Sequence, residues 1–143
     1  MIGIIVATHG NLCYGLKDTY EMVAGVISEN VSFISLAKNI DVSKFKELFK
    51  KCIHSAEKYD GILVLVDLEG GSPYNVASEY FYNEEYANKI SIVSGVNFSS
   101  LVEAIENAED MDLEKLTQEV IKSGTEGIKR VQKIESIEEE EEF

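Results

Sequence analysis

The chain of 143 residues suits one domain of ordinary size, which can bury most of its apolar surface without disulfides or a structural metal. Its formal net charge of −13 argues against nucleic acid and against an anionic membrane surface as partners, because both demand clustered lysine and arginine. We expect one domain over residues 1–134 and an acidic, disordered tail over residues 135–143, which holds five consecutive glutamates.

Signals for membrane insertion or export are missing from the pattern. The first residues do not combine a basic stretch, an apolar stretch and a cleavage site, and no apolar run reaches the roughly 18 residues that span a bilayer. Cys13 and Cys52 lack metal-ligand spacing and are expected to be reduced thiols. These features predict a cytoplasmic protein.

The first predicted element is a strand that ends abruptly in polar residues. The apolar run over residues 4–7 is typical of a strand covered on both faces of a parallel sheet. The turn that follows holds Thr8, His9, Gly10 and Asn11. His9 is therefore expected at the carboxyl end of the strand, where open α/β folds place their ligands.

Helical and strand patterns then alternate. The first helical pattern, which stops near Gly25, is carried by Leu12, Leu16, Tyr20 and Val23. Residues 31–36 predict a strand nearer the sheet edge. A second helix, for which Ser43 is available as a cap, has the apolar face Phe45, Leu48, Phe49, Cys52, Ile53 and Ala56. His54 lies off that face and is assigned no role.

The second half of the chain repeats this alternation of strand and helix patterns. Residues 61–67 form an apolar strand that ends at Asp67, and the next helix is expected to start with Ser72 as N-cap and Pro73 at the first helical position. A fourth strand over residues 89–95 leads through Asn97 into a helix. That helix carries Leu101, Val102 and Ile105. Two further segments follow, a helical pattern from Leu113 to about Gly124 and residues 127–134, which fit either helix or strand.

This alternation predicts a doubly wound, mainly parallel α/β sheet with right-handed crossovers. With strand order 2-1-3-4, the first and third strands are neighbours, and their carboxyl ends border the ligand crevice. His9 ends the first of these strands and Asp67 ends the third. The topology therefore predicts that the two side chains meet.

A His–Asp pair of this kind makes a competent nucleophile. A carboxylate that accepts a hydrogen bond from one imidazole nitrogen leaves the other nitrogen free to attack, and it stabilises the positive charge that develops. Asp67 is placed to do this for His9. Taken alone, the histidine also fits a plain turn residue and the aspartate a turn or cap acid.

The segment EGGSPYN, residues 69–75, predicts an anion cradle beside this pair. Gly70 and Gly71 permit a tight turn with converging N–H groups, and Ser72 adds a hydroxyl at the positive end of a helix dipole. Such a segment is also a common strand-to-helix connection. Together with His9, and without a metal cluster or cofactor motif, it indicates transient phosphorylation of the histidine.

At these residues the sequence resembles the IIA component of the mannose family (mannose, fructose and sorbose) of the bacterial phosphoenolpyruvate-dependent sugar phosphotransferase system. The matching features, in family order up to about Gly127, are IIVATHG, Gly25, VLVDLEGGSPYN and SGVNFSSLVEAI. Glu69 stands where the family usually carries a large aromatic or apolar residue, and Ser99 where it usually carries proline.

The resemblance implies a phosphoryl carrier with a phosphohistidine intermediate. His9 accepts the group from phosphorylated HPr and passes it to a IIB component, which serves a membrane sugar permease. Asp67 orients His9, the phosphoryl oxygens are bound by Thr8, Gly70, Gly71 and Ser72, and Asn97 helps to shape the rim. The family is also dimeric and exchanges its last strand as an antiparallel edge, which makes residues 127–134 a strand.

Three other functions fit a reactive histidine. Glu69 and the acidic tail favour a regulatory module whose partner responds to His9 phosphorylation. The phosphoryl-transfer subunit of dihydroxyacetone kinase shares the fold but lacks the GGSPYN loop. A phosphate-ester hydrolase would need a general acid, which these motifs do not supply.

Overall fold

Four apolar runs form the strands of a parallel sheet in the computed structural model, which describes residues 1–134. The strands are β1 (Gly3–His9), β2 (Val31–Leu36), β3 (Ile62–Val66) and β4 (Ile90–Val93). They lie in the order β2-β1-β3-β4. This confirms the predicted doubly wound α/β fold and its strand order.

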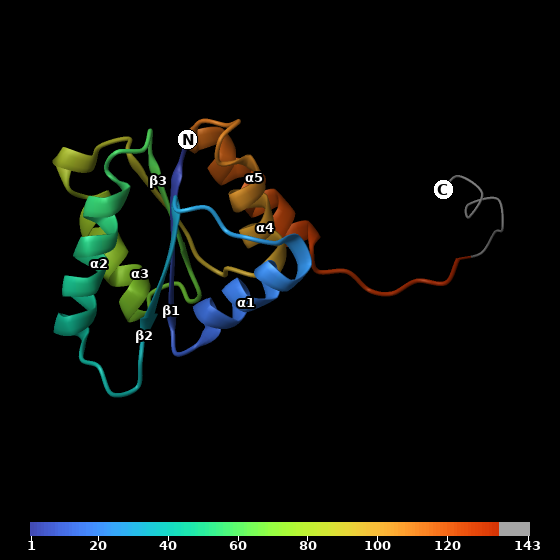
Figure 1. The fold of residues 1–143 in the computed structure, drawn as a ribbon, viewed down its shortest axis with the longest axis horizontal. Coiled ribbons are helices and arrows are strands. Elements are labelled where there is room, and N and C mark those ends of the chain that lie inside the picture. Colours follow the sequence, from blue (N-terminus) through green and yellow to red (C-terminus); the bar gives the residue numbers. More distant parts are fainter. Residues whose placement is uncertain (135–143) are drawn as a thin grey trace.

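Helices cover both faces of the sheet. They are α1 (Leu12–Ala24), α2 (Val42–Ala56), α3 (Ser72–Phe81), α4 (Phe98–Asn107) and α5 (Leu113–Glu126), with a short 3₁₀ helix η1 (Glu84–Tyr86) before β4. Figure 1 shows α1, α4 and α5 on one side of the strands, and α2 and α3 on the other.

The central strands are apolar throughout because each face meets its own helical layer. Alternate residues Ile4, Val6, Leu63 and Leu65 belong to the core cluster that includes α1, α4 and α5. Their neighbours Ile5, Ala7, Val64 and Val66 belong to the cluster of α2 and α3. Successive side chains of a strand point to opposite faces, so both kinds of position are buried in these strands, and the polar Thr8 near the end of β1 is buried as well.

The register of the two central strands aligns their carboxyl ends. Ala7 of β1 pairs with Val66 of β3. Asp67 follows directly after β3, and His9 is the last residue of β1. Both polar side chains therefore lie at the same edge of the sheet.

Two predicted helix caps are wrong. Asp41, not Ser43, caps α2: its side chain accepts a hydrogen bond from the N–H of Lys44. Gly71, not Ser72, is the N-cap of α3, with Pro73 still in the first turn. The turn after β3 already closes at Gly71, whose N–H donates to the Leu68 carbonyl, so Ser72 is helical.

Two helices differ from their predicted patterns. In α1, Leu12 and Val23 are exposed while Cys13 and Tyr20 are buried, because the helix turns a slightly different face to the sheet. The last helix, α5, continues past Gly124 to Glu126. Gly124 packs closely on α4, where an added Cβ would lie 3.1 Å from Cβ of Ser100.

Residues 128–134 form neither helix nor strand in this single chain, and Figure 1 shows them leading away from the body after α5. The predicted exchanged strand requires a second subunit, so it stays a prediction. The predicted acidic tail, residues 135–143, lies outside the described residues.

Candidate functional site

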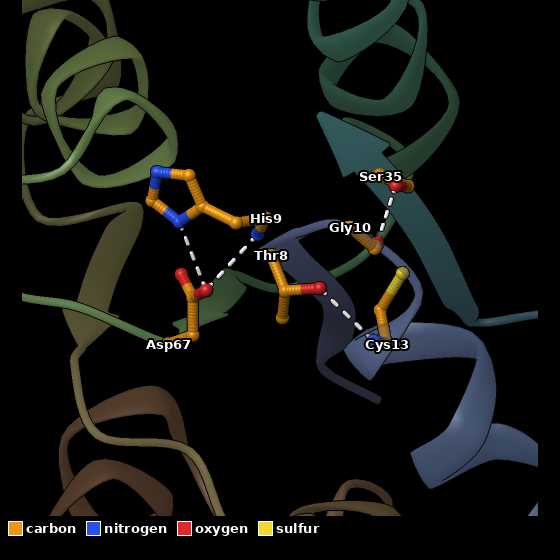
Figure 2. A network of polar contacts seen from close by, with 6 residues as sticks. All are labelled: Thr8, His9, Gly10, Cys13, Ser35 and Asp67. Carbon is orange, nitrogen blue, oxygen red and sulfur yellow. Dashed lines mark hydrogen bonds and ion pairs between the residues drawn. The ribbon is translucent and has the colours of Figure 1, made fainter. Parts of the chain in front are cut away.

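The imidazole of His9 is fixed by one carboxylate oxygen. Its Nδ1 lies 2.9 Å from Oδ2 of Asp67, and its backbone N–H donates to the same oxygen at 3.0 Å (Figure 2). A carboxylate can only accept, so Nδ1 carries the proton and Nε2 keeps its lone pair. The two bonds orient both the ring and the backbone of His9.

The pair combines an accessible ring with a sheltered carboxylate. The His9 side chain is 43% exposed, whereas that of Asp67 is 15% exposed. The second oxygen of Asp67, Oδ1, is buried and has no hydrogen-bond partner within residues 1–134. The carboxylate is therefore directed at the ring and the backbone of His9 through its other oxygen, Oδ2.

The turn after β1 is held from β2 as well. Ser35 Oγ donates a hydrogen bond to the Gly10 carbonyl (Figure 2). The Gly10 N–H donates to the Leu36 carbonyl at 2.9 Å. Gly10 has a positive φ of 58°, which glycine adopts without strain. Sequence reasoning missed Ser35, because a serine late in a mixed strand carries no signal of its distant partner.

Thr8 supports this turn from inside. Its side chain is fully buried, and Oγ1 accepts a hydrogen bond from the Cys13 N–H at 2.9 Å. The hydroxyl therefore replaces a helix cap at the start of α1, where Asn11 makes no side-chain cap bond. Thr8 is close to His9 along the chain, but its hydroxyl faces the start of α1.

The turn between β3 and α3 brings the predicted cradle beside His9. Gly70 has a φ of 80°, and its carbonyl accepts from the Asn75 side chain at 3.1 Å. The N–H of Asn75 donates to the Gly71 carbonyl at 2.9 Å. The start of α3, with Ser72 as its first residue, lies next to the imidazole, since a Cβ built on Gly71 would lie 2.7 Å from Cε1 of His9. First-turn N–H groups have no helical partner there.

Two other polar residues have their side-chain partners outside the pair. Asn97 caps α4 in a reciprocal box with Ser100 and donates to the Gly124 carbonyl at 2.9 Å, so it joins α4 to α5. His54 is exposed on α2, with Nδ1 3.5 Å from a Glu57 carboxylate oxygen.

A hollow of about 620 Å³ opens beside His9. Its walls come mainly from the segment between β2 and α2, and they include Leu36, Ala37, Lys38, Ile40 and Val42. Besides His9, the charged residues of the lining are Lys38 and Asp41, and one oxygen of Asp41 already accepts from the Lys44 N–H. The mainly apolar remainder suits a protein side chain better than a free sugar, whose hydroxyls need several polar partners.

Potential metal ligands and thiols within residues 1–134 are arranged as follows. That part of the chain has no group of three or more His, Cys, Asp or Glu side chains placed to hold a metal ion. Both cysteines are free, and burial raises the pKa of each thiol. In the same range, every helix is too short or too polar to cross a membrane.

The fold and the site define a doubly wound α/β protein with a carboxylate-oriented histidine at its topological switch point. A family model named EIIA-man, described as PTS system fructose IIA component, matches residues 3–121, and the chain belongs to this family.

Curated and solved relatives agree with this assignment. The mannose-specific EIIAB component of Escherichia coli K12 is 31% identical over 129 residues, and the fructose-specific EIIA component of Bacillus subtilis is 26% identical over 116 residues. These alignments cover 90% and 81% of the chain, but 39% and 77% of the relatives. The chain thus spans about two fifths of the length of the E. coli protein.

A crystal structure of the phosphotransferase system component EIIA from Streptococcus agalactiae is similar in both sequence and fold. It is 33% identical, with a TM-score of 0.81 over 91% of this chain and 97% of the other.

Proposed function

We propose that the chain is a cytoplasmic phosphoryl carrier for sugar uptake, with His9 as the residue that is phosphorylated. The observation that carries this proposal is the 2.9 Å contact between Nδ1 and Asp67, which leaves Nε2 as the unprotonated nitrogen of a side chain that is 43% exposed. The donor is phosphorylated HPr and the acceptor is a IIB component. The membrane permease is reached only through the IIB component.

The transfer balances without a cofactor. The Nε2 lone pair of His9 attacks the phosphorus of the donor's phosphohistidine, and the donor's P–N bond breaks with its electron pair returning to the donor imidazole. The ring of His9 becomes cationic while Nδ1 keeps its proton, and the Asp67 carboxylate stabilises that charge. Transfer to the IIB component repeats the exchange and restores the neutral ring.

The phosphoryl oxygens are bound by the backbone N–H groups of Gly70 and Gly71, by Ser72, and by the N-terminus of α3. The Gly71 N–H, which also donates to the Leu68 carbonyl at 3.2 Å, is shared between the two acceptors. Support comes from the adjacency of this turn to the imidazole. We assign Thr8 an indirect role, since its buried hydroxyl accepts from Cys13 and holds the turn that carries His9.

We further propose a homodimer in which residues 127–134 add to the sheet of the partner subunit. Ile128, Val131 and Ile134 are exposed in the single chain, although apolar side chains of this size gain from burial. In addition, β4 lies at the edge of the sheet. Such an edge accepts a further strand readily.

The test is the intact mass after incubation with phosphoenolpyruvate, its phosphotransferase and HPr. We expect one added phosphoryl group on the wild type and on His54→Ala, and none on His9→Ala. Label on His9→Ala would contradict the assignment of His9. Addition of a cognate IIB component then separates carrier from regulator, because a regulator alone would keep its label.

A further inference from the structure

Gly71 lies against the ring of His9 near Cε1, the carbon between the two ring nitrogens. A Cβ built on Gly71 would lie 2.7 Å from Cε1 of His9 and 3.4 Å from Nε2. Carbon atoms that are not bonded prefer separations of about 3.5–4.0 Å, so the first contact is a severe overlap. The imidazole occupies the space that the side chain of any other residue would need.

The backbone at this position does not itself require glycine. Gly71 has φ −76° and ψ 171°, an extended conformation that any residue adopts. The preceding Gly70 differs, since its φ of 80° lies in the left-handed region. Two adjacent glycines therefore serve different needs: Gly70 allows the turn, and Gly71 leaves room for the ring.

The turn cannot easily move away to make room for a side chain. The Gly71 N–H donates to the Leu68 carbonyl at 3.2 Å, and the Gly71 carbonyl accepts from the Asn75 N–H at 2.9 Å. The Asn75 side chain also holds the Gly70 carbonyl. A clash at position 71 would therefore displace the imidazole, whose ring hydrogen bond within residues 1–134 is the one to Asp67.

We propose that Gly71 is a positioning residue for His9. Together with Asp67, Gly71 fixes the plane of the imidazole and thereby the direction of Nε2. Asp67 holds the ring through Nδ1. Because Gly71 has no Cβ, the ring atom Cε1 can occupy the space next to it. The consequence for phosphoryl transfer rests on the function proposed above, whereas the consequence for ring orientation does not.

The first experiment reads the ring directly. Nitrogen-15 NMR of His9 reports which imidazole nitrogen is protonated, in the wild type and in three variants. Gly71→Ala is the test variant and Gly15→Ala is the matched control. Asp67→Asn provides the reference nitrogen-15 spectrum of a His9 ring whose Nδ1 has lost its carboxylate partner. Gly15 lies within α1, and nothing comes within 4 Å of an added Cβ there.

We expect Gly15→Ala to keep the wild-type signature, with the proton on Nδ1, and Gly71→Ala to shift toward that of Asp67→Asn. The rate of His9 phosphorylation by phosphoramidate, a small donor that needs no docking, should fall about 10-fold or more in Gly71→Ala but not in Gly15→Ala, because a misplaced reacting atom is costly. A wild-type spectrum in Gly71→Ala would overturn the proposal.

A double-mutant cycle covers the case in which Gly71→Ala folds poorly. We expect Gly71→Ala to lower the melting temperature in the wild-type chain but not in a His9→Ala chain, where the ring is gone. Equal destabilisation in both chains would show that the backbone needs glycine and would overturn the proposal. If the wild type takes no phosphoryl group from any donor, the proposed function fails while the NMR result and the cycle still decide the role of Gly71.

Discussion

The two ends of the sheet both carry pairs of ionisable groups, but only the carboxyl end holds its pair rigidly. There, Asp67 is 15% exposed and accepts from both the ring and the backbone of His9. At the amino end, the terminal amine of Met1 meets Asp60, whose side chain is 80% exposed. Exposed pairs contribute little because water screens them, so proximity of charges alone does not make a site.

The amino end also has a hollow, of about 320 Å³, lined by Glu57, Asp60, Tyr86 and Lys89 among others. Its best-defined contact is the hydrogen bond from the Tyr86 hydroxyl to Glu57 at 2.8 Å. Within residues 1–134, the turns from β1 to α1 and from β3 to α3 lie at the carboxyl end instead, because each follows the carboxyl end of a parallel strand. Both ends of the sheet thus carry ionisable side chains, but the pair at the carboxyl end is held more firmly by hydrogen bonds.

The largest expected effect comes from Asp67→Asn. We expect the rate of His9 phosphorylation by phosphorylated HPr to fall about 10²-fold, since the amide no longer selects the Nδ1–H tautomer or holds the ring in place. A time course of intact mass measures it. The matched control is Asp60→Asn at the other end of the sheet, and equal rates for the two variants would contradict the comparison.

A smaller effect is expected for Ser72→Ala. Loss of one hydroxyl donor to a charged phosphoryl group costs about 1.5 kcal/mol, which is about 10-fold in rate, while the backbone donors remain. The same mass assay measures the rate. Ser78→Ala in the same helix is the control, because that hydroxyl donates to the Tyr74 carbonyl. A rate loss shared by both variants would point to α3 stability and away from phosphoryl binding.

Ser35→Ala tests the support from β2. Loss of the hydrogen bond to the Gly10 carbonyl should lower the free energy of unfolding by about 1 kcal/mol. We expect the phosphorylation rate to fall only about two- to threefold, because Asp67 still holds the ring. Urea unfolding and the mass assay measure the two quantities. Ser32→Ala on the same strand should change neither quantity. If Ser35→Ala had wild-type stability and a wild-type phosphorylation rate, Ser35 would not support the site.

The smallest effect on the rate, none, is expected for Tyr86→Phe at the amino end. Partial burial, followed by the hydrogen bond to Glu57 and the charge of Glu57, raises the pKa of Tyr86 from 10.0 to about 12. The unfolded chain therefore loses this proton first, and the stabilising contribution is full below pH 10 and declines as the pH rises toward 12.

Urea unfolding of Tyr86→Phe between pH 9 and about 12 tests this shift by difference from the wild type. The variant should lose less stability over that range, because phenylalanine has no proton to release. Identical pH dependence would show that Tyr86 titrates normally in the folded protein. A changed phosphorylation rate would contradict the assignment of function to the carboxyl end alone.

The sequence by itself determined the elements, their order and the central pair of the site. Uninterrupted apolar runs mark strands covered on both faces, and alternation with helical patterns leaves few topologies. In the order 2-1-3-4, the residues that end the first and third strands must meet, so His9 and Asp67 could be paired across 58 positions of chain.

Only the tertiary structure decided how each side chain is used. Thr8, Asn97 and Ser72 all read as polar residues near a ligand, yet Thr8 supports α1, Asn97 joins α4 to α5, and Gly71 takes the N-cap predicted for Ser72. Ser35 and the ring contact of Gly71 have no local signal at all. Periodicity reports which way a residue faces, whereas its partner depends on contacts between segments far apart in the chain.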